Sequence, residues 1–279
     1  MKATTIVYLA VFPLLLLPLL AIAHEEDRVD GRYDNNDNDH YDGALALKQR
    51  SFNIAVGVTF YLVIITLVLL RYGKLFTSRQ KWAFYLAIAV PVALVTLYAA
   101  GTTIYLNLTS HTAGPVHWHA DFEIWNCGKQ IDLRDPRGAS NRIGTSTFHE
   151  HGDNRIHVEG VVVKLPDASL HRFFEVVGGK LAEEELRVPT NEGFVSVGKG
   201  DFCENGEGDE EGKVQVFVYQ TEGETYQQRK ITDEYVLSPQ ALVPPGDCLI
   251  IEFDREKEHT DKLCLSYQRA IERGELHGR

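Results

Sequence analysis

Histidine and acidic residues are concentrated in two short segments of the chain, and both residue types bind transition metals. Residues 117–125 read HWHADFEIW, and residues 148–159 read FHEHGDNRIHVE. Together these segments hold five of the 11 histidines. Imidazole and carboxylate groups are ligands of zinc, copper and related ions. The two segments therefore predict a metal site.

The alternation of residue types within each segment predicts β-strands that carry ligands on one face. Successive side chains of a strand point to opposite faces, so odd-numbered residues of the first segment share a face. That face would carry His117, His119 and Glu123, and the other face would be apolar. His157 and Glu159 alternate with apolar residues in the same way. If these strands pair in one sheet, the two sets of ligands can meet.

A second His-x-His pair enlarges the predicted site. His149 and His151 repeat the spacing of the first pair, which places two rings near enough to bind one ion when the backbone is extended. One of the glutamates Glu123, Glu150 and Glu159 could act as a further ligand, as a hydrogen-bond partner of a ligand, or as a proton-transfer group. The predicted metal ligands are His117, His119, His149, His151, His157, Glu123 and Glu159.

The ligand types favour copper or zinc and exclude two common classes of site. A blue-copper site needs a cysteine between histidines and usually a methionine, but Met1 is the single methionine and no histidine closely follows Cys127. Thiolate zinc sites need paired cysteine spacing, which the chain lacks. The first His-x-His with Glu123 resembles the first motif of cupins, without their glycine spacing or second motif. The alternative is exposed strand histidines that bind nothing.

The residues before these segments predict membrane insertion. Residues 1–23 form a largely apolar run that ends in Ala-Ile-Ala, which is typical of a signal peptide, although the run is also long enough for an uncleaved anchor. Residues 24–50 are rich in Asp, Asn and Glu and predict an acidic disordered tail. Residues 51–71 and 82–106 are apolar and long enough to be transmembrane helices.

The charges around the two predicted spans indicate their orientation. Residues 72–81 are basic and hold no acidic residue, so the positive-inside bias places this loop in the cytoplasm. Residues 111–279 would then be extracytoplasmic. Apart from Arg71 at the end of the first span, the spans contain no Asp, Glu, Lys, Arg or His that could form an ion path, which favours an anchor. The formal net charge of -11 argues against nucleic acid as a partner.

Residues 111–279 predict an α+β domain, mainly of antiparallel strands, with one or two short helices. Residues 213–220 alternate in polarity and residues 248–253 are apolar, as expected of strands, while Ser169 could cap a short helix. All four cysteines lie in this region. In an oxidising compartment their even number favours one or two disulfides, with three possible connectivities when all four pair; buried thiols are the alternative.

The two histidine blocks also carry resemblances to known families. HWHADFEIW and HEH-x5-HVEG resemble a set of uncharacterised prokaryotic membrane-anchored proteins, which implies that the blocks form one unit and implies no mechanism. Cleavage after Ala23 would make His24 the amino terminus, where its amine and ring could chelate copper. His24 with His117 and His119 is similar to the copper sites of particulate methane monooxygenase and related membrane oxygenases, which also combine soluble domains with membrane helices.

The sequence thus predicts a membrane-anchored, extracytoplasmic protein that binds copper or zinc. It could hold, sense or pass on the metal, or it could be an enzyme that activates water or oxygen at an open coordination position. The alternative is a cell-surface structural or interaction domain without a metal.

Overall fold

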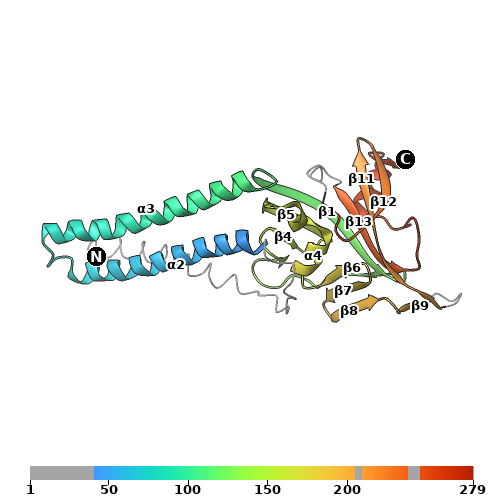
Figure 1. Cartoon of the computed structure of the whole chain (residues 1–279), viewed down its shortest axis with the longest axis horizontal. Helices are drawn as coiled ribbons and strands as arrows, with labels where there is room; N and C mark the ends of the chain where they lie inside the picture. The colour runs from blue at the N-terminus through green and yellow to red at the C-terminus, as the bar shows by residue number, and fades with distance from the viewer. Residues whose placement is uncertain (1–40, 205–208, 238–245, 279) are drawn as a thin grey trace. The chain divides into compact units, whose positions relative to one another are not determined.

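The computed structural model describes residues 41–204, 209–237 and 246–278. The predicted signal segment and the tail up to residue 40, including His24, lie outside the described residues. The chain divides into two compact units, with the boundary between Thr109 and Ser110. Figure 1 shows the helices and strands of each unit.

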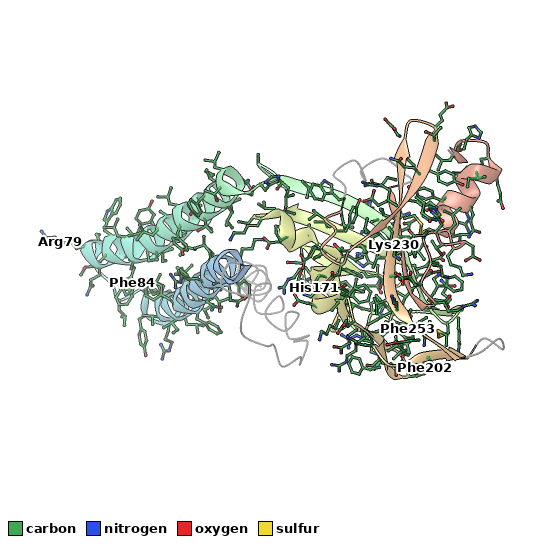
Figure 2. All side chains as sticks on the ribbon, turned by 45° about the vertical axis from the view of Figure 1, so that its right-hand side comes forward. Arg79, Phe84, His171, Phe202, Lys230 and Phe253 are labelled. Atoms are coloured by element: carbon green, nitrogen blue, oxygen red, sulfur yellow. A yellow bond between two sulfur atoms is a disulfide. The ribbon has the colours of Figure 1, made fainter. Side chains whose placement is uncertain are left out.

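The first unit consists of two long helices, α2 (Tyr41–Tyr72) and α3 (Ser78–Thr109), which pack against each other. Most of their large apolar side chains are exposed and project outward from both helices (Figure 2). Both helices are long and apolar enough to cross a membrane. The sequence therefore predicted the two apolar helices correctly.

Helix α2 begins earlier than the sequence predicted. Residues 41–50 were assigned to the disordered tail, but they form the first turns of the helix. This part of the chain contains Ala44, Leu45, Ala46 and Leu47, which are among the best helix-forming residue types. These residues were assigned to the tail because the residues before them are strongly polar.

The second unit is built on a nine-stranded sheet with the order β14-β12-β11-β13-β1-β5-β4-β3, and β2 also pairs with β1. The strands of this sheet are β1 (Pro115–Asn126), β2 (Lys129–Ile131), β3 (Ile143–Gly144), β4 (Phe148–Glu150), β5 (Arg155–Val161), β11 (Lys213–Glu222), β12 (Thr225–Ile231), β13 (Asp247–Asp254) and β14 (His277–Gly278).

Smaller elements complete the unit. A three-stranded sheet and a two-stranded sheet lie between β5 and β11 in sequence. They are accompanied by one 3-10 helix and two short α-helices. These elements are β6 (Lys180–Ala182), β7 (Glu185–Thr190), β8 (Gly193–Gly198), β9 (Phe202–Glu204), β10 (Asp209–Glu211), η1 (Leu165–Ala168), α4 (Leu170–Val176) and α5 (Leu265–Glu272).

The observed architecture is α+β, as predicted, and most strand pairs are antiparallel. The central pair β1–β13 is parallel, however, as is β12–β14. All residues of β13 except Asp254 are buried, because apolar clusters cover both faces of this strand. A continuous apolar run is typical of such a doubly covered strand.

Strand β1 places its two faces in different environments. Trp118, Ala120, Phe122 and Ile124 are buried in the larger core, whereas the odd-numbered residues before Trp125 are not. The ring of Phe173 in α4 lies 5.4 Å from that of Phe122 and 5.5 Å from that of Phe148 in β4. Helix α4 therefore packs against both β1 and β4 on the core side of the sheet. The Ser169 side chain accepts a hydrogen bond from the Arg172 amide, which confirms the predicted cap.

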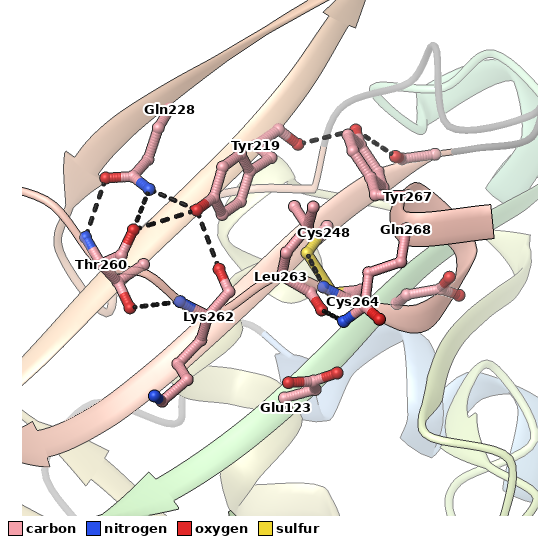
Figure 3. The surroundings of a disulfide bond; sticks show 12 residues. Glu123, Tyr219, Gln228, Cys248, Thr260, Lys262, Leu263, Cys264, Tyr267 and Gln268 are labelled. Atoms are coloured by element: carbon pink, nitrogen blue, oxygen red, sulfur yellow. Dashed lines mark hydrogen bonds between the residues drawn. A yellow bond between two sulfur atoms is a disulfide. The ribbon is translucent and has the colours of Figure 1, made fainter. Parts of the chain in front are cut away.

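All four cysteines form disulfides. Cys127, in the turn after β1, pairs with Cys203 in β9. Cys248 in β13 pairs with Cys264, directly before α5 (Figure 3). The structure thus selects one of the three connectivities that the sequence left open.

Candidate metal centre

Strand register brings the two histidine segments together. In the antiparallel β1–β5 pair, His117 lies opposite Glu159 and His119 lies opposite His157. In the next pair, β4–β5, His149 lies opposite the same His157. Directly opposed residues share a face of the sheet, so three strands contribute to one cluster. At the end of the β1–β5 pair, next to this cluster, Arg155 Nε lies 2.6 Å from Asp121 Oδ1 and forms an ion pair with it.

The ligand atoms fall into two overlapping groups. In each group they lie within 4.8 Å of one another, and His157 is common to both. Zinc binds imidazole nitrogen at about 2.0–2.1 Å, so small side-chain movements would bring either group to coordination distance. The first group is His117, His119, His157 and Glu159, and the second is His149, His151 and His157. The structure therefore unites all five predicted histidines and Glu159.

Several contacts define the geometry within the groups. His117 Nε2 lies 3.1 Å from Glu159 Oε1, and His149 Nε2 lies 3.1 Å from His151 Nε2. The His151 and His157 rings are 4.8 Å apart. A nitrogen pair as close as that of His149 and His151 is what two ligands of one ion require.

Exposure of the ligands decreases across the cluster. The His117 side chain is 61% exposed, that of His157 is 12% exposed, and that of His149 is 2% exposed. Nδ1 of His149 and both ring nitrogens of His157 are buried without a hydrogen-bond partner among the described residues. Leaving such atoms unsatisfied costs about 1–3 kcal/mol each. A metal ion would satisfy a ring nitrogen of His157, so the cluster fits a bound metal. The nitrogen of His149 that faces the cluster is Nε2, so an ion there would leave its Nδ1 unchanged.

Electrostatics keeps the inner imidazoles neutral. The pKa of His149 is lowered to about 4, mainly because the ring is buried and secondly because the His151 ring lies beside it. Burial also lowers the pKa of His157, and burial with the nearby His157 lowers the pKa of His119. A metal binds the unprotonated nitrogen, so these shifts keep the ligands ready at neutral pH.

Outer contacts orient the loop between β4 and β5. His151 Nδ1 donates to the Asn141 carbonyl oxygen at 2.5 Å, which directs its Nε2 into the cluster. Glu150 is buried and accepts the amides of Asp153 and Asn154. Burial raises the pKa of Glu150. Glu150 therefore holds this loop in place and is not among the metal ligands.

Glu123 is the one predicted ligand that the structure does not bring to the cluster. Strand β5 begins at Arg155, which pairs with Asp121. Glu123 therefore lies beyond the part of β1 that is paired with β5. Its carboxylate accepts a hydrogen bond from Trp125 Nε1 at 3.0 Å, and burial raises its pKa. Figure 3 shows Glu123 in the surroundings of the Cys248–Cys264 disulfide. Residue parity was correct, but parity does not indicate where a partner strand ends.

A third group of possible ligands, which the sequence did not indicate, is His171, Asp233 and Glu234. His171 Nδ1 lies 2.8 Å from the Leu181 carbonyl oxygen, and its Nε2 lies 3.5 Å from Glu175. The hydrogen bond with Glu175 is the main cause that raises the pKa of His171 to about 9. His171 Nδ1 also lies 3.2 Å from Asp233 Oδ2. A protonated imidazole has no free lone pair, so His171 is the cation of ion pairs with Glu175 and Asp233, and the second pair links α4 to Asp233.

The chain matches no protein-family model, no curated protein and no solved structure.

The low pKa of His149 predicts an acid-sensitive fold in the metal-free protein. Its pKa is about 4 when folded and 6.5 when unfolded. Between these values the unfolded state binds a proton that the folded state does not, so stability falls as the pH falls through this window. The loss from His149 should reach about 3 kcal/mol. Urea unfolding at both ends of the window should show a smaller loss for His149→Asn; an equal loss would contradict the assignment.

A side chain at Gly144 is expected to displace the backbone beside His149. A Cβ at this position would lie 2.5 Å from the Phe148 carbonyl oxygen and 3.1 Å from His149 Cα, at a φ of +107°. Gly144→Ala should therefore displace β4 and weaken zinc binding by about tenfold or more. Gly114→Ala is the matched control, because it shares the positive φ and has open space around its Cβ. Equal zinc affinities in a competitive titration would show that β4 does not position the ligands.

Proposed function

We propose that the chain is a membrane-anchored protein that binds copper or zinc in an extracytoplasmic domain and handles the metal there. One observation carries this proposal: five histidines and Glu159 from three adjacent strands meet in one cluster. The unsatisfied ring nitrogens of His157 support it, because buried polar atoms in native proteins normally have partners.

The donor atoms support copper or zinc as the metal. The cluster offers imidazole nitrogens and one carboxylate, a set that suits zinc and copper(II). All four cysteines are in disulfides, so no thiolate competes as a ligand. Hard ions such as magnesium and calcium prefer sites made of oxygen ligands.

The disulfides and helices support the proposed location. Disulfides persist in oxidising compartments outside the cytoplasm, and two helices could anchor the chain in a membrane. The basic segment between α2 and α3 supports a cytoplasmic position for that turn. The signal segment, the role of His24 and the resemblance to uncharacterised membrane-anchored proteins remain predictions.

The contacts of the carboxylates favour metal handling over catalysis. Glu123 and Glu150, two of the predicted proton-transfer groups, accept hydrogen bonds from groups outside the cluster. Glu159 lies 3.1 Å from His117, where it would itself bind the ion. His117 and Glu159 are 61% and 43% exposed, so an ion can reach the cluster from solvent. A site open at one end and buried at the other suits the uptake and release of an ion.

Metal titration of the full-length protein in detergent, purified with a tag that lacks histidine, tests the proposal. Zinc and copper(II) affinities are measured by competition with a chelator of known affinity. The His119→Ala/His157→Ala variant should bind at least about 100-fold more weakly than the wild type. His259→Ala/His277→Ala, which removes two exposed histidines outside the cluster, is the matched control and should bind normally. Unchanged affinity in the first variant would refute the proposal.

A further inference from the structure

His157 is shared by both groups of ligands, although a nitrogen lone pair can bind only one ion. Its side chain is 12% exposed, and it lies between His119 in β1 and His149 in β4. The ring centroid of His157 is 4.7 Å from that of His119 and 5.4 Å from that of His149. If both groups bind an ion at once, His157 must use both of its nitrogens.

The two nitrogens of His157 face different surroundings. Nδ1 lies 4.0 Å from Glu159 Oε1, on the side of the first group, and Nε2 lies 3.5 Å from Asp153 Oδ2. Neither nitrogen has a hydrogen-bond partner among the described residues. A histidine that binds one metal usually donates its other N–H to a carbonyl or carboxylate, as His151 does to Asn141. The corresponding contact of His157, with the Asp153 carboxylate, is longer at 3.5 Å and leaves both ring nitrogens without a hydrogen bond among the described residues, so both can bind a metal.

We propose that the cluster binds two copper or zinc ions bridged by His157. Nδ1 would complete a site with His117, His119 and Glu159, and Nε2 would complete a site with His149 and His151. The inference rests on the proposed metal-binding function. When the second ion binds, it replaces the remaining N–H proton of His157, which passes to solvent, and the ring becomes an imidazolate bridge.

Charge in the cluster favours two neighbouring cations. Glu159 lies between the groups, with Oε1 3.1 Å from His117 Nε2 and Oε2 4.0 Å from His149 Nε2. Asp153 adds a second carboxylate beside His157. Together with an imidazolate, these two carboxylates supply three negative charges against the four positive charges of two divalent ions. The large positive charge that would otherwise oppose binding of the second ion is thereby mostly neutralised.

Copper(II) titration of the full-length protein, followed by electron paramagnetic resonance, tests the bridge. The wild type should bind two coppers in the cluster. Its signal should grow with the first copper and fall with the second, since an imidazolate couples the two spins. His117→Ala/His119→Ala and His149→Ala/His151→Ala should each keep one copper with an uncoupled signal. A variant without all four of these histidines gives the copper bound elsewhere on the chain, which is subtracted.

The outcomes separate this inference from the function on which it rests. One copper in the wild type, lost in both pair variants, would overturn the two-ion site and leave metal binding intact. Two coppers whose signals simply add would overturn the bridge. No copper above that of the four-histidine variant would refute metal binding itself. The wild-type measurement is decisive even if a pair variant fails to fold.

Discussion

Saturation with zinc is expected to raise the free energy of unfolding of the second unit, which contains the nine-stranded sheet, by about 4 kcal/mol. This value applies when the free zinc concentration is about 1,000 times the dissociation constant. The proposed ligands come from β1, β4 and β5, so the unfolded chain would not hold them together and the ion would bind the folded state preferentially. For a unit of this size the melting temperature should rise by roughly 8–16 °C. Thermal unfolding with zinc and with excess chelator measures the difference.

The control for this prediction is the variant that lacks two central ligands, His119→Ala/His157→Ala. It should melt at the same temperature with zinc and with chelator, because its cluster no longer binds the ion tightly. An equal zinc-dependent rise in this variant would mean that zinc stabilises the fold from another place. No rise in the wild type at saturating zinc would contradict preferential binding to the folded state.

Loss of the Cys127–Cys203 disulfide is expected to destabilise the same unit by about 4 kcal/mol. The bond joins residues 76 positions apart, and the entropy that a cross-link removes from the unfolded chain grows with the length of the closed loop. Cys203 is almost fully buried in the larger core and ties β9 to the turn after β1. Chemical unfolding of Cys127→Ala/Cys203→Ala measures the cost.

The second disulfide provides an internal comparison. Cys248 and Cys264 are 16 positions apart, so removing their bond should cost less, about 3 kcal/mol. Neither disulfide links β1, β4 and β5 to one another, so zinc affinity should persist in both variants if they fold. A larger loss from the 16-residue loop than from the 76-residue loop would contradict the loop-closure explanation.

The sequence predicted the part of the site that depends on local periodicity. Alternation in β1 and β5 is a property of single strands, so the shared face of His117, His119, His157 and Glu159 could be read from parity. The apolar helices α2 and α3 likewise follow from composition and length alone. The cap at Ser169 depends on neighbouring residues and was also predictable.

Features that depend on pairing between distant segments could not be predicted in this way. Glu123 has the correct parity, but the start of β5 at Arg155 places it outside the cluster. The parallel pairing of β13 with β1 joins segments more than a hundred residues apart, and no local pattern specifies its direction. The choice among three disulfide connectivities depends on the same long-range packing.

The cluster also shows why the inner histidines are poor surface residues and good ligands. An exposed strand histidine would bond to water and keep a normal pKa. His149 is instead buried, and its pKa is lowered to about 4. Both ring nitrogens of His157 are buried without a hydrogen-bond partner among the described residues. Burial of unpaired polar atoms is costly, and a bound metal would compensate for it at His157.

X-ray absorption at the zinc or copper edge shows whether the histidine cluster holds the metal, because it reports the atoms bonded to the ion. On the metal-loaded full-length protein we expect a shell of nitrogen and oxygen at about 2.0–2.1 Å for zinc, with the multiple-scattering pattern of several imidazoles. The imidazole pattern should disappear in the His119→Ala/His157→Ala variant. A sulfur shell, or a shell of oxygen without imidazole scattering, would show that this histidine cluster does not hold the metal.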